Sequence, residues 1–387
     1  MNLLDRHIFR SILTTAMAAV ALFAFVLAAG NVIRDLLGPL LSGQLPILSF
    51  GRLVLLLIPF VVSYALPLGM LTGVLLTLGR LSSDSEVTAM RAAGLSLPRI
   101  ARPALLLALL GVVLALRVNF ESMPWARVQY HRELAVAIRA NPLSYLRPKT
   151  FIREFPGYVV YVGSMDSGSK DGSNVRDFWL WQLDNERRVI RFVRAESGRV
   201  EYDEAANDFI VTLTNARVDE HDRKALDDFT QPLRVNTFGQ VDPVRLSLSK
   251  YFGSESVHQK LQWMTYDELL AERDRVASEV VPAGGERQHA RNLMKVSLTI
   301  QDKINMALAV FSFAFVGVPL GIKVSRRETS ANLGVAVLLA LAYYFLIVVV
   351  GWLDQHPEYR PDLLLWAPNV IFMAIGAWLL TRLDRAS

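Results

Sequence analysis

Two short segments of the sequence carry residue types and spacings that could do chemistry. Residues 163–170 read Gly-Ser-Met-Asp-Ser-Gly-Ser-Lys, with a glycine spacing similar to that of a phosphate-binding loop. That signature needs Gly-Lys followed by Ser or Thr at the start of a helix. Here Ser169 separates the second glycine from Lys170, and further turn residues follow. We therefore expect a loop between two strands, without phosphate chemistry.

The second segment is predicted to be a short independent helix, residues 83–93, with a signal at each end. Ser83 and Glu86 have the spacing of a capping box. Asp84 and Glu86 would lie at the positive end of the helix dipole. Gly94 would supply a left-handed cap at the other end.

The chemistry that this helix offers is recognition of a partner. Glu86, Met90 and Ala93 share one face by their i, i+4, i+7 spacing. If such a short helix connects two membrane spans, it is what a permease needs to receive force from an ATPase. A capping role for Glu86 alone is the simpler alternative, and the two roles are compatible.

No other pattern in the sequence points to catalysis, a metal or a cofactor. The chain has no cysteine, which excludes disulfides, Cys-liganded metal sites and a thiol nucleophile. It has no HExxH or GxSxG motif, and its six histidines are scattered. We therefore expect a protein that is not an enzyme and that holds neither metal nor cofactor.

Long windows without an ionisable residue must position the short helix, and they indicate a membrane protein. About 20 apolar residues in a helix cross the hydrocarbon core of a bilayer. Five windows have about that length: 11–33, 53–79, 304–322, 329–353 and 363–381. The first is longer than the apolar part of a signal peptide, so we expect an uncleaved span.

A sixth window, residues 103–116, is too short to span alone. It reaches spanning length if Arg102 and Arg117 extend toward water and residues 118–120 are included. A re-entrant or interfacial segment is the alternative.

Basic residues set the expected orientation of these six spans. With the N-terminus inside, the short inside segments carry eleven Lys and Arg, and the short outside segments carry four. Both termini are therefore predicted to be cytosolic. The net charge of +5 then reflects membrane topology, and we expect no nucleic-acid partner.

Residues 121–303 form a long polar insertion that this orientation places outside. Segments rich in β-branched and aromatic residues are expected as strands at 151–162, 175–183, 189–202, 209–214, 230–238 and 244–249. The run from Asp203 to Asp208 is the predicted turn of a hairpin. No helical pattern separates the strands, so we expect a sandwich or jelly roll.

Two helices are expected to follow the strands. Thr265 and Glu268 form a capping box that opens a helix to about Val281. Residues 286–295 then lead into the fourth span.

The predicted fold class is an α-helical polytopic membrane protein, with six transmembrane helices and an inserted all-β, jelly-roll-like periplasmic domain. Residues 1–120 would hold spans one to three with the 83–93 helix. Residues 121–303 would hold the β domain and its connecting helices, and residues 304–387 the last three spans.

Several stretches carry a resemblance to a known family. The most specific runs from residue 78 to 96 and includes Asp-Ser-Glu…Arg-Ala-Ala-Gly. Further stretches are Leu66-Pro-Leu-Gly-Met-Leu-Thr-Gly73, Trp125, Glu133, Ala140-Asn-Pro142, Val318-Pro-Leu-Gly321, Arg326-Arg327 and Trp366-Ala-Pro-Asn369. Together with the order of spans, they closely resemble the lipopolysaccharide export permease family of the LptF/LptG type.

This resemblance implies a half-transporter of the bacterial inner membrane. Members pair as two related permeases on a dimer of a cytosolic ATPase and extract lipopolysaccharide from the membrane. Their periplasmic β-jelly rolls pass the lipid to a bridge of similar folds. The Ala140-Asn-Pro142 stretch favours the F-type subunit.

The resemblance also implies roles for individual residues. Glu86 would be the coupling carboxylate that docks in a groove of the ATPase. Four neighbours would surround it: Asp84, Val87, Met90 and Arg91. Arg34 matches a basic position that meets lipid phosphates, which a guanidinium binds in bidentate fashion. An ordinary interfacial arginine is the alternative for Arg34.

Two other classes of protein are compatible with the same pattern. One is an ATP-driven permease that transmits motion to a periplasmic domain without carrying substrate; it has four spans, and residues 103–116 would not cross. The other is a membrane-anchored sensor or scaffold, which would not associate stably with an ATPase.

Overall fold

The computed structural model describes most of the chain, and the described residues form two compact units. The structure describes residues 3–41, 45–140, 146, 148–153, 155, 157–166, 172–184, 188–203, 206, 208–220, 234–247, 260–279, 285–324, 329–353 and 357–385. The helical unit comprises Met1–Arg34, Leu53–Tyr130 and Gln259–Ser387. The second unit comprises Asp35–Arg52 and His131–His258 and contains a β-sheet.

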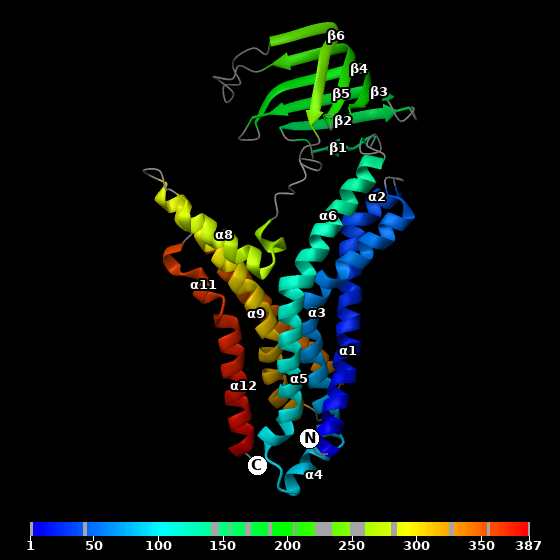
Figure 1. The fold of residues 1–387 in the computed structure, drawn as a ribbon. Helices are drawn as coiled ribbons and strands as arrows, with labels where there is room; N and C mark the ends of the chain where they lie inside the picture. The colour runs from blue at the N-terminus through cyan, green and yellow to red at the C-terminus, as the bar shows by residue number, and fades with distance from the viewer. Residues whose placement is uncertain are drawn as a thin grey trace. The chain divides into compact units, whose positions relative to one another are not determined.

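The helices follow the order that the apolar windows predict (Figure 1). They are α1 (Leu3–Asn31), α2 (Leu37–Leu41), α3 (Ile47–Ser83), α4 (Glu86–Ala92), α5 (Leu97–Arg117), α6 (Met123–Ala140), α8 (Tyr266–Ser278), α9 (Glu286–Val324), α10 (Thr329–Gly351), α11 (Pro361–Leu364) and α12 (Ala367–Arg385). Short π-helical turns occupy Val32–Leu36 and Val118–Ser122, and 3-10 turns occupy Leu261–Trp263 and Pro357–Tyr359.

Six helical segments of the described chain are long and apolar enough to cross a membrane, which confirms the predicted number. The doubtful window, residues 103–116, lies inside α5, and the helix continues through the second π-helical turn into α6. The apolar segment there extends over Leu97–Leu134, so it has spanning length.

Small residues let the helices approach one another closely. A Cβ atom placed on Gly69 of α3 would lie 2.2 Å from Val20 of α1, and one on Gly73 would lie 2.6 Å from the Cα atom of Ala16. Glycines four residues apart are typical of helix contacts in membranes, where packing replaces the hydrophobic effect. The glycines of the 66–73 stretch therefore allow α1 and α3 to pack together.

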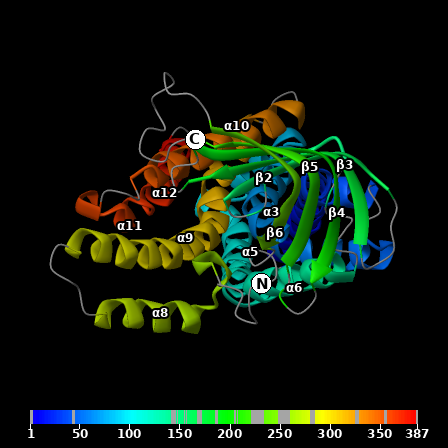
Figure 2. The same cartoon turned by 90° about the horizontal axis from the view of Figure 1, so that it is seen from above.

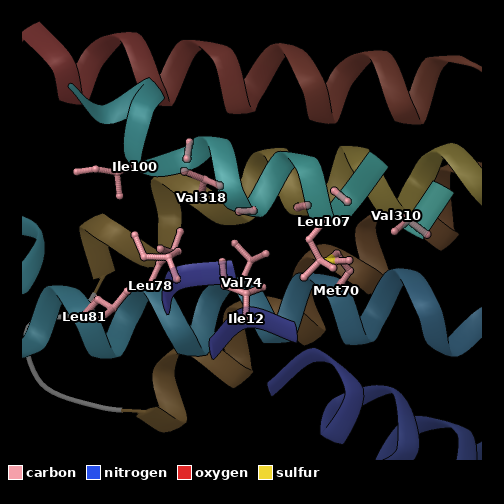
Figure 3. Close-up of a cluster of buried hydrophobic side chains, with 14 of the residues drawn as sticks. Ile12, Met70, Val74, Leu78, Leu81, Ile100, Leu107, Val310 and Val318 are labelled. Carbon is pink, nitrogen blue, oxygen red and sulfur yellow. The ribbon is translucent and has the colours of Figure 1, made fainter. Parts of the chain in front are cut away.

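A buried cluster joins α1, α3, α4, α5 and α9 (Figure 3). Its members include Ile12, Met70, Val74, Leu78, Leu81, Ile100, Leu107, Val310 and Val318. Val87 and Met90 of the short helix α4 belong to the same cluster. α8 lies beside the first part of α9, where Leu269 packs against Val296 and Ile300 (Figure 2).

The second unit contains one antiparallel sheet in which sequence neighbours are spatial neighbours (Figure 1). Its strands are β1 (Phe151–Ile152), β2 (Tyr158–Met165), β3 (Gly172–Leu183), β4 (Val189–Asp203), β5 (Asp208–Glu220) and β6 (Arg234–Ser247). Asp203 pairs with Asp208, which confirms the predicted hairpin. The described strands form a meander, and the jelly roll stays a prediction.

Three of the predicted strands need correction. Residues 151–162 are not one strand, because the chain breaks between β1 and β2 near Gly157, which has φ 74°. The expected strands 230–238 and 244–249 are parts of the single strand β6, with residues 230–233 and 248–249 outside the described residues. Pro243 is tolerated within β6 because this strand pairs only with β5 among the described strands.

The predicted capping box at residue 83 is wrong. α3 continues through Ser83, and the residue before α4 is Ser85, which has φ 61° and makes no side-chain cap hydrogen bond. Leu81 is fully buried and Ser82 donates a hydrogen bond to the Ile322 carbonyl of α9, so contacts with distant segments prolong α3. The helix predicted for 83–93 is therefore α4, residues 86–92.

The predictions of a helix that begins after Thr265 and of a link between two strands near residues 163–170 agree with the described residues. Thr265 and Glu268 form the expected capping box, with donor–acceptor distances of 2.7 and 3.4 Å. α8 ends at Ser278, and residue 281 lies outside the described residues. Gly163 belongs to β2, and β3 follows, so the phosphate-loop alternative lacks the helix that it requires; residues 167–171 are outside the described residues.

Candidate functional site

α4 is a seven-residue helix held on the bundle by two apolar side chains. Val87 and Met90 are 3% and 8% exposed and pack in the cluster shared with α1, α3 and α5. Burial of such a side chain stabilises the folded state by about 1.5–3 kcal/mol. Figure 1 shows α4 at the end of the bundle that also carries both chain termini.

The end of α4 is fixed by backbone geometry. Gly94 has φ 85°, which confirms the predicted left-handed cap. The Leu95 N–H donates to the Met90 carbonyl at 3.1 Å, and the Gly94 N–H donates to the Arg91 carbonyl at 2.9 Å. These two bonds form a Schellman motif, which makes the end of α4 well defined.

The acidic residues of this segment face away from the bundle. Asp84 and Glu86 are exposed, and Arg91 is half-buried. The predicted face of Glu86, Met90 and Ala93 is not one surface, because Met90 enters the core while the other two are exposed. The buried stripe consists of Val87 and Met90, and Glu86 lies at its margin.

Arg34 lies at the other end of α1. It is exposed on a π-helical turn and donates a hydrogen bond to the Asn31 side chain at 3.2 Å. Because α1 has 29 residues, it is about 43 Å long. The sequence-predicted residues therefore form two separate places: Asp84, Glu86, Val87, Met90 and Arg91 at one end, and Arg34 at the other.

A buried polar cluster that no sequence pattern predicted surrounds Lys303, which is 6% exposed. The Lys303 ammonium donates to the carbonyls of Asn119 and Met264 at 3.0 and 2.8 Å and lies 5.5 Å from the centre of the Phe120 ring. The Asn119 side chain donates back to the Lys303 carbonyl at 3.0 Å and accepts from Ser63. The signal in the sequence that could have revealed this cluster is Asn119, an asparagine within an extended apolar helix.

A second buried network explains the asparagine of the Trp366-Ala-Pro-Asn369 stretch. The Asn369 amide donates to the backbone and side-chain oxygens of Asn305 at 3.1 and 3.0 Å. Its own oxygen accepts from Ser312 at 2.8 Å and from Tyr343 at 3.3 Å. Asn369 therefore joins α9, α10 and α12. Polar side chains inside apolar spans usually make such interhelical hydrogen bonds.

No group of three or more His, Asp or Glu side chains that could hold a metal ion occurs among the residues that the structure describes. The geometry offers docking and helix packing instead. The short helix α4, with the exposed carboxylate of Glu86, packs on a bundle of six apolar helices, and a β-sheet unit is inserted in the sequence between the third and fourth of them.

Comparison with known proteins identifies the family of this arrangement. A family model described as lipopolysaccharide export system permease LptF/LptG matches residues 6–382. The chain belongs to this family. LptF/LptG proteins are permeases, so the chain is a lipopolysaccharide export permease of the inner membrane with several membrane spans and is not itself catalytic.

Individual LptF proteins are similar over nearly the whole chain. The lipopolysaccharide export system permease protein LptF of Escherichia coli K12 is 23% identical over 381 residues, which cover 96% of this chain and 92% of that protein. The LptF proteins of E. coli O157:H7 and Shigella flexneri give the same figures. The resemblance to this family that residues 78–96 indicate is thereby confirmed.

Proposed function

We propose that this chain is the permease subunit of an ATP-driven transporter that extracts lipopolysaccharide from the inner membrane and passes it to a periplasmic bridge, for export to the outer membrane. The observation that carries the proposal is α4, a short helix with the buried side chains Val87 and Met90 and the exposed carboxylate of Glu86. A dimeric cytosolic ABC ATPase would supply the hydrolysis. A second related permease would complete the membrane part, with this chain as the F-type subunit.

The orientation is inferred from charge. In the topology predicted from the sequence, the short segments that share a side with α4 and the termini carry eleven Lys and Arg, and those on the other side carry four. This bias puts α4 and both termini in the cytosol. The insertion between residues 121 and 303 is then periplasmic, with residues 1–120 and 304–387 holding three spans each, and its sheet would belong to a jelly roll.

In the proposed coupling, the residues of the α4 segment have two roles. Asp84, Glu86 and Arg91 meet the ATPase, while Val87 and Met90 transmit its movement to the bundle. The supporting observation is that the first three are exposed or half-buried, whereas the last two pack against α1, α3 and α5. A rigid connection needs a defined helix end, which the Schellman motif supplies.

Co-purification of the full complex tests the docking role. Glu86→Gln keeps the size of the side chain and removes its charge. Because charge-assisted hydrogen bonds contribute about 1.5–3 kcal/mol, we expect the ATPase to bind at least about tenfold more weakly. Thr88→Ala, on an exposed residue of the same helix, is the matched control and should bind normally. Equal retention of the ATPase by both variants would contradict the docking role.

Arg34 is proposed to contact the phosphates of lipopolysaccharide where the lipid enters the transporter. Its exposure at the end of α1 and the bidentate geometry of a guanidinium support this role. A photoreactive residue at position 34 should form adducts with lipopolysaccharide in an active complex. A photoreactive residue at Met17, which is 63% exposed in the middle of α1, serves as the control. Equal labelling at both positions would contradict the lipid-binding role and favour the alternative that Arg34 is an ordinary interfacial arginine.

A further inference from the structure

The β-sheet has a second face, opposite its buried core, that carries neighbouring aromatic rings. Along β3, Phe178 and Leu180 enter the core, whereas Trp179 and Trp181 lie on the other face and are half-buried. The rings on this face, which we call the aromatic platform, belong to Phe151, Tyr161, Trp179, Trp181 and Phe192. Neighbouring ring centres are 5.1 to 6.1 Å apart, with tilted or edge-on geometry.

Beside the platform, the sheet is creased at two residues with unusual backbone angles. Asp177 and Asn215 have φ 52° and 53°, values that residues other than glycine rarely adopt. On β3, Val175 and Phe178 are both buried although they are three positions apart, so the alternation of buried and exposed residues is interrupted at Asp177 while the register with β2 and β4 continues unchanged. The resulting depression has a volume of about 740 Å³ and is lined by residues of β3, β4, β5 and β6.

Three arginines border this crease. The side chains of Arg176, Arg194 and Arg217 are 74%, 58% and 60% exposed. Two carboxylates, those of Asp177 and Glu196, also line the depression. Arg176 and Arg217 form ion pairs with Asp166 and Asp219, which lie outside the lining.

The crease and the platform are continuous. Trp179 pairs with Arg194, and Arg194 pairs with Arg217 on the next strand, so the three side chains form one row across the sheet. The Arg194 guanidinium lies 4.9 Å from the centre of the Trp179 ring and 3.5 Å from the carboxylate of Asp177. Cations and tryptophan faces attract each other at this distance.

This combination fits one class of ligand. Aromatic side chains combine a large apolar surface with a rigid shape, which suits the C–H faces of sugar rings. Guanidinium groups bind phosphate and carboxylate oxygens in a planar, bidentate manner. We propose that the platform and the crease bind the anionic saccharide of lipopolysaccharide, with sugar rings on the platform and phosphates at the arginines. The inference rests on the proposed function, which makes lipopolysaccharide the transported molecule.

Binding of a soluble saccharide to the full permease complex tests this inference. The probe is the phosphorylated core oligosaccharide that remains after the acyl chains of lipopolysaccharide are removed. Trp179→Leu and Arg194→Gln should each weaken its binding at least about tenfold. Enzymatic removal of the phosphates should weaken binding to the wild-type protein similarly and to Arg194→Gln little further. Arg199→Gln is the matched control, because Arg199 is exposed on β4, pairs with Glu201 and lies outside the crease.

Two results would overturn the inference. One is unchanged oligosaccharide binding in both variants. The other is a photoreactive residue at position 181 that forms adducts with a protein or with phospholipid and none with lipopolysaccharide. Transport is measured separately. Export without oligosaccharide binding would contradict only the proposed binding site. Oligosaccharide binding without ATP-dependent export would contradict only the proposed function.

Discussion

At the scale of single residues, Lys303 shows how a charge is buried near a membrane span. Its ammonium donates to two backbone carbonyls and lies beside an aromatic ring. The carbonyl of Asn119 belongs to the π-helical turn between α5 and α6, and that of Met264 lies just before α8. Lys303 therefore ties together the two places where the chain leaves the bundle toward residues 131–258 and returns from them.

Replacement of this lysine tests its importance. Lys303→Met keeps the length of the side chain but leaves the two carbonyls without their donor, which costs about 1–3 kcal/mol for a buried polar group. We expect a lower midpoint of thermal unfolding for the protein in detergent. Lys295→Met, on an exposed residue of α9, should leave the midpoint nearly unchanged. If both variants melted alike, the carbonyl contacts would not stabilise the fold.

At the scale of elements, the pairing of α1 with α3 depends on glycine. Ala16 and Val20 of α1 occupy the space that side chains at Gly73 and Gly69 would need. Gly321 of α9 similarly lies close to α3, where an added Cβ atom would be 3.1 Å from that of Leu78. These positions belong to stretches that carry the family resemblance, and the structure gives a packing reason for their small size.

A larger side chain at this crossing should separate the two helices. Gly73→Leu places atoms where the backbone of Ala16 lies, and overpacking of this kind costs about 1–3 kcal/mol. The variant should unfold at a lower temperature in detergent. Gly51→Ala is the control within the same helix, because nothing lies within 4 Å of its added Cβ atom. A normal melting temperature for Gly73→Leu would contradict the close approach.

At the scale of the whole molecule, local sequence patterns predicted most elements, and distant contacts decided the rest. Apolar length predicted five of the six spans, and turn composition predicted the β4–β5 hairpin, because both signals lie within the segment concerned. The prediction of a cap at residue 83 was wrong because burial of Leu81 prolongs α3. Lys303 was missed because its partner Asn119 lies 184 positions away, beyond the reach of any local pattern.

We propose that an ATPase docked on α4 drives lipopolysaccharide export through this chain. The most direct test is ATP-dependent transfer of lipopolysaccharide from proteoliposomes, which contain this chain, the second permease and the ATPase, to a soluble periplasmic acceptor. We predict transfer with the wild-type chain and with Thr88→Ala, and a rate at least about tenfold lower with Glu86→Gln. Transfer that needs no ATP, or that proceeds equally with Glu86→Gln, would contradict the claim.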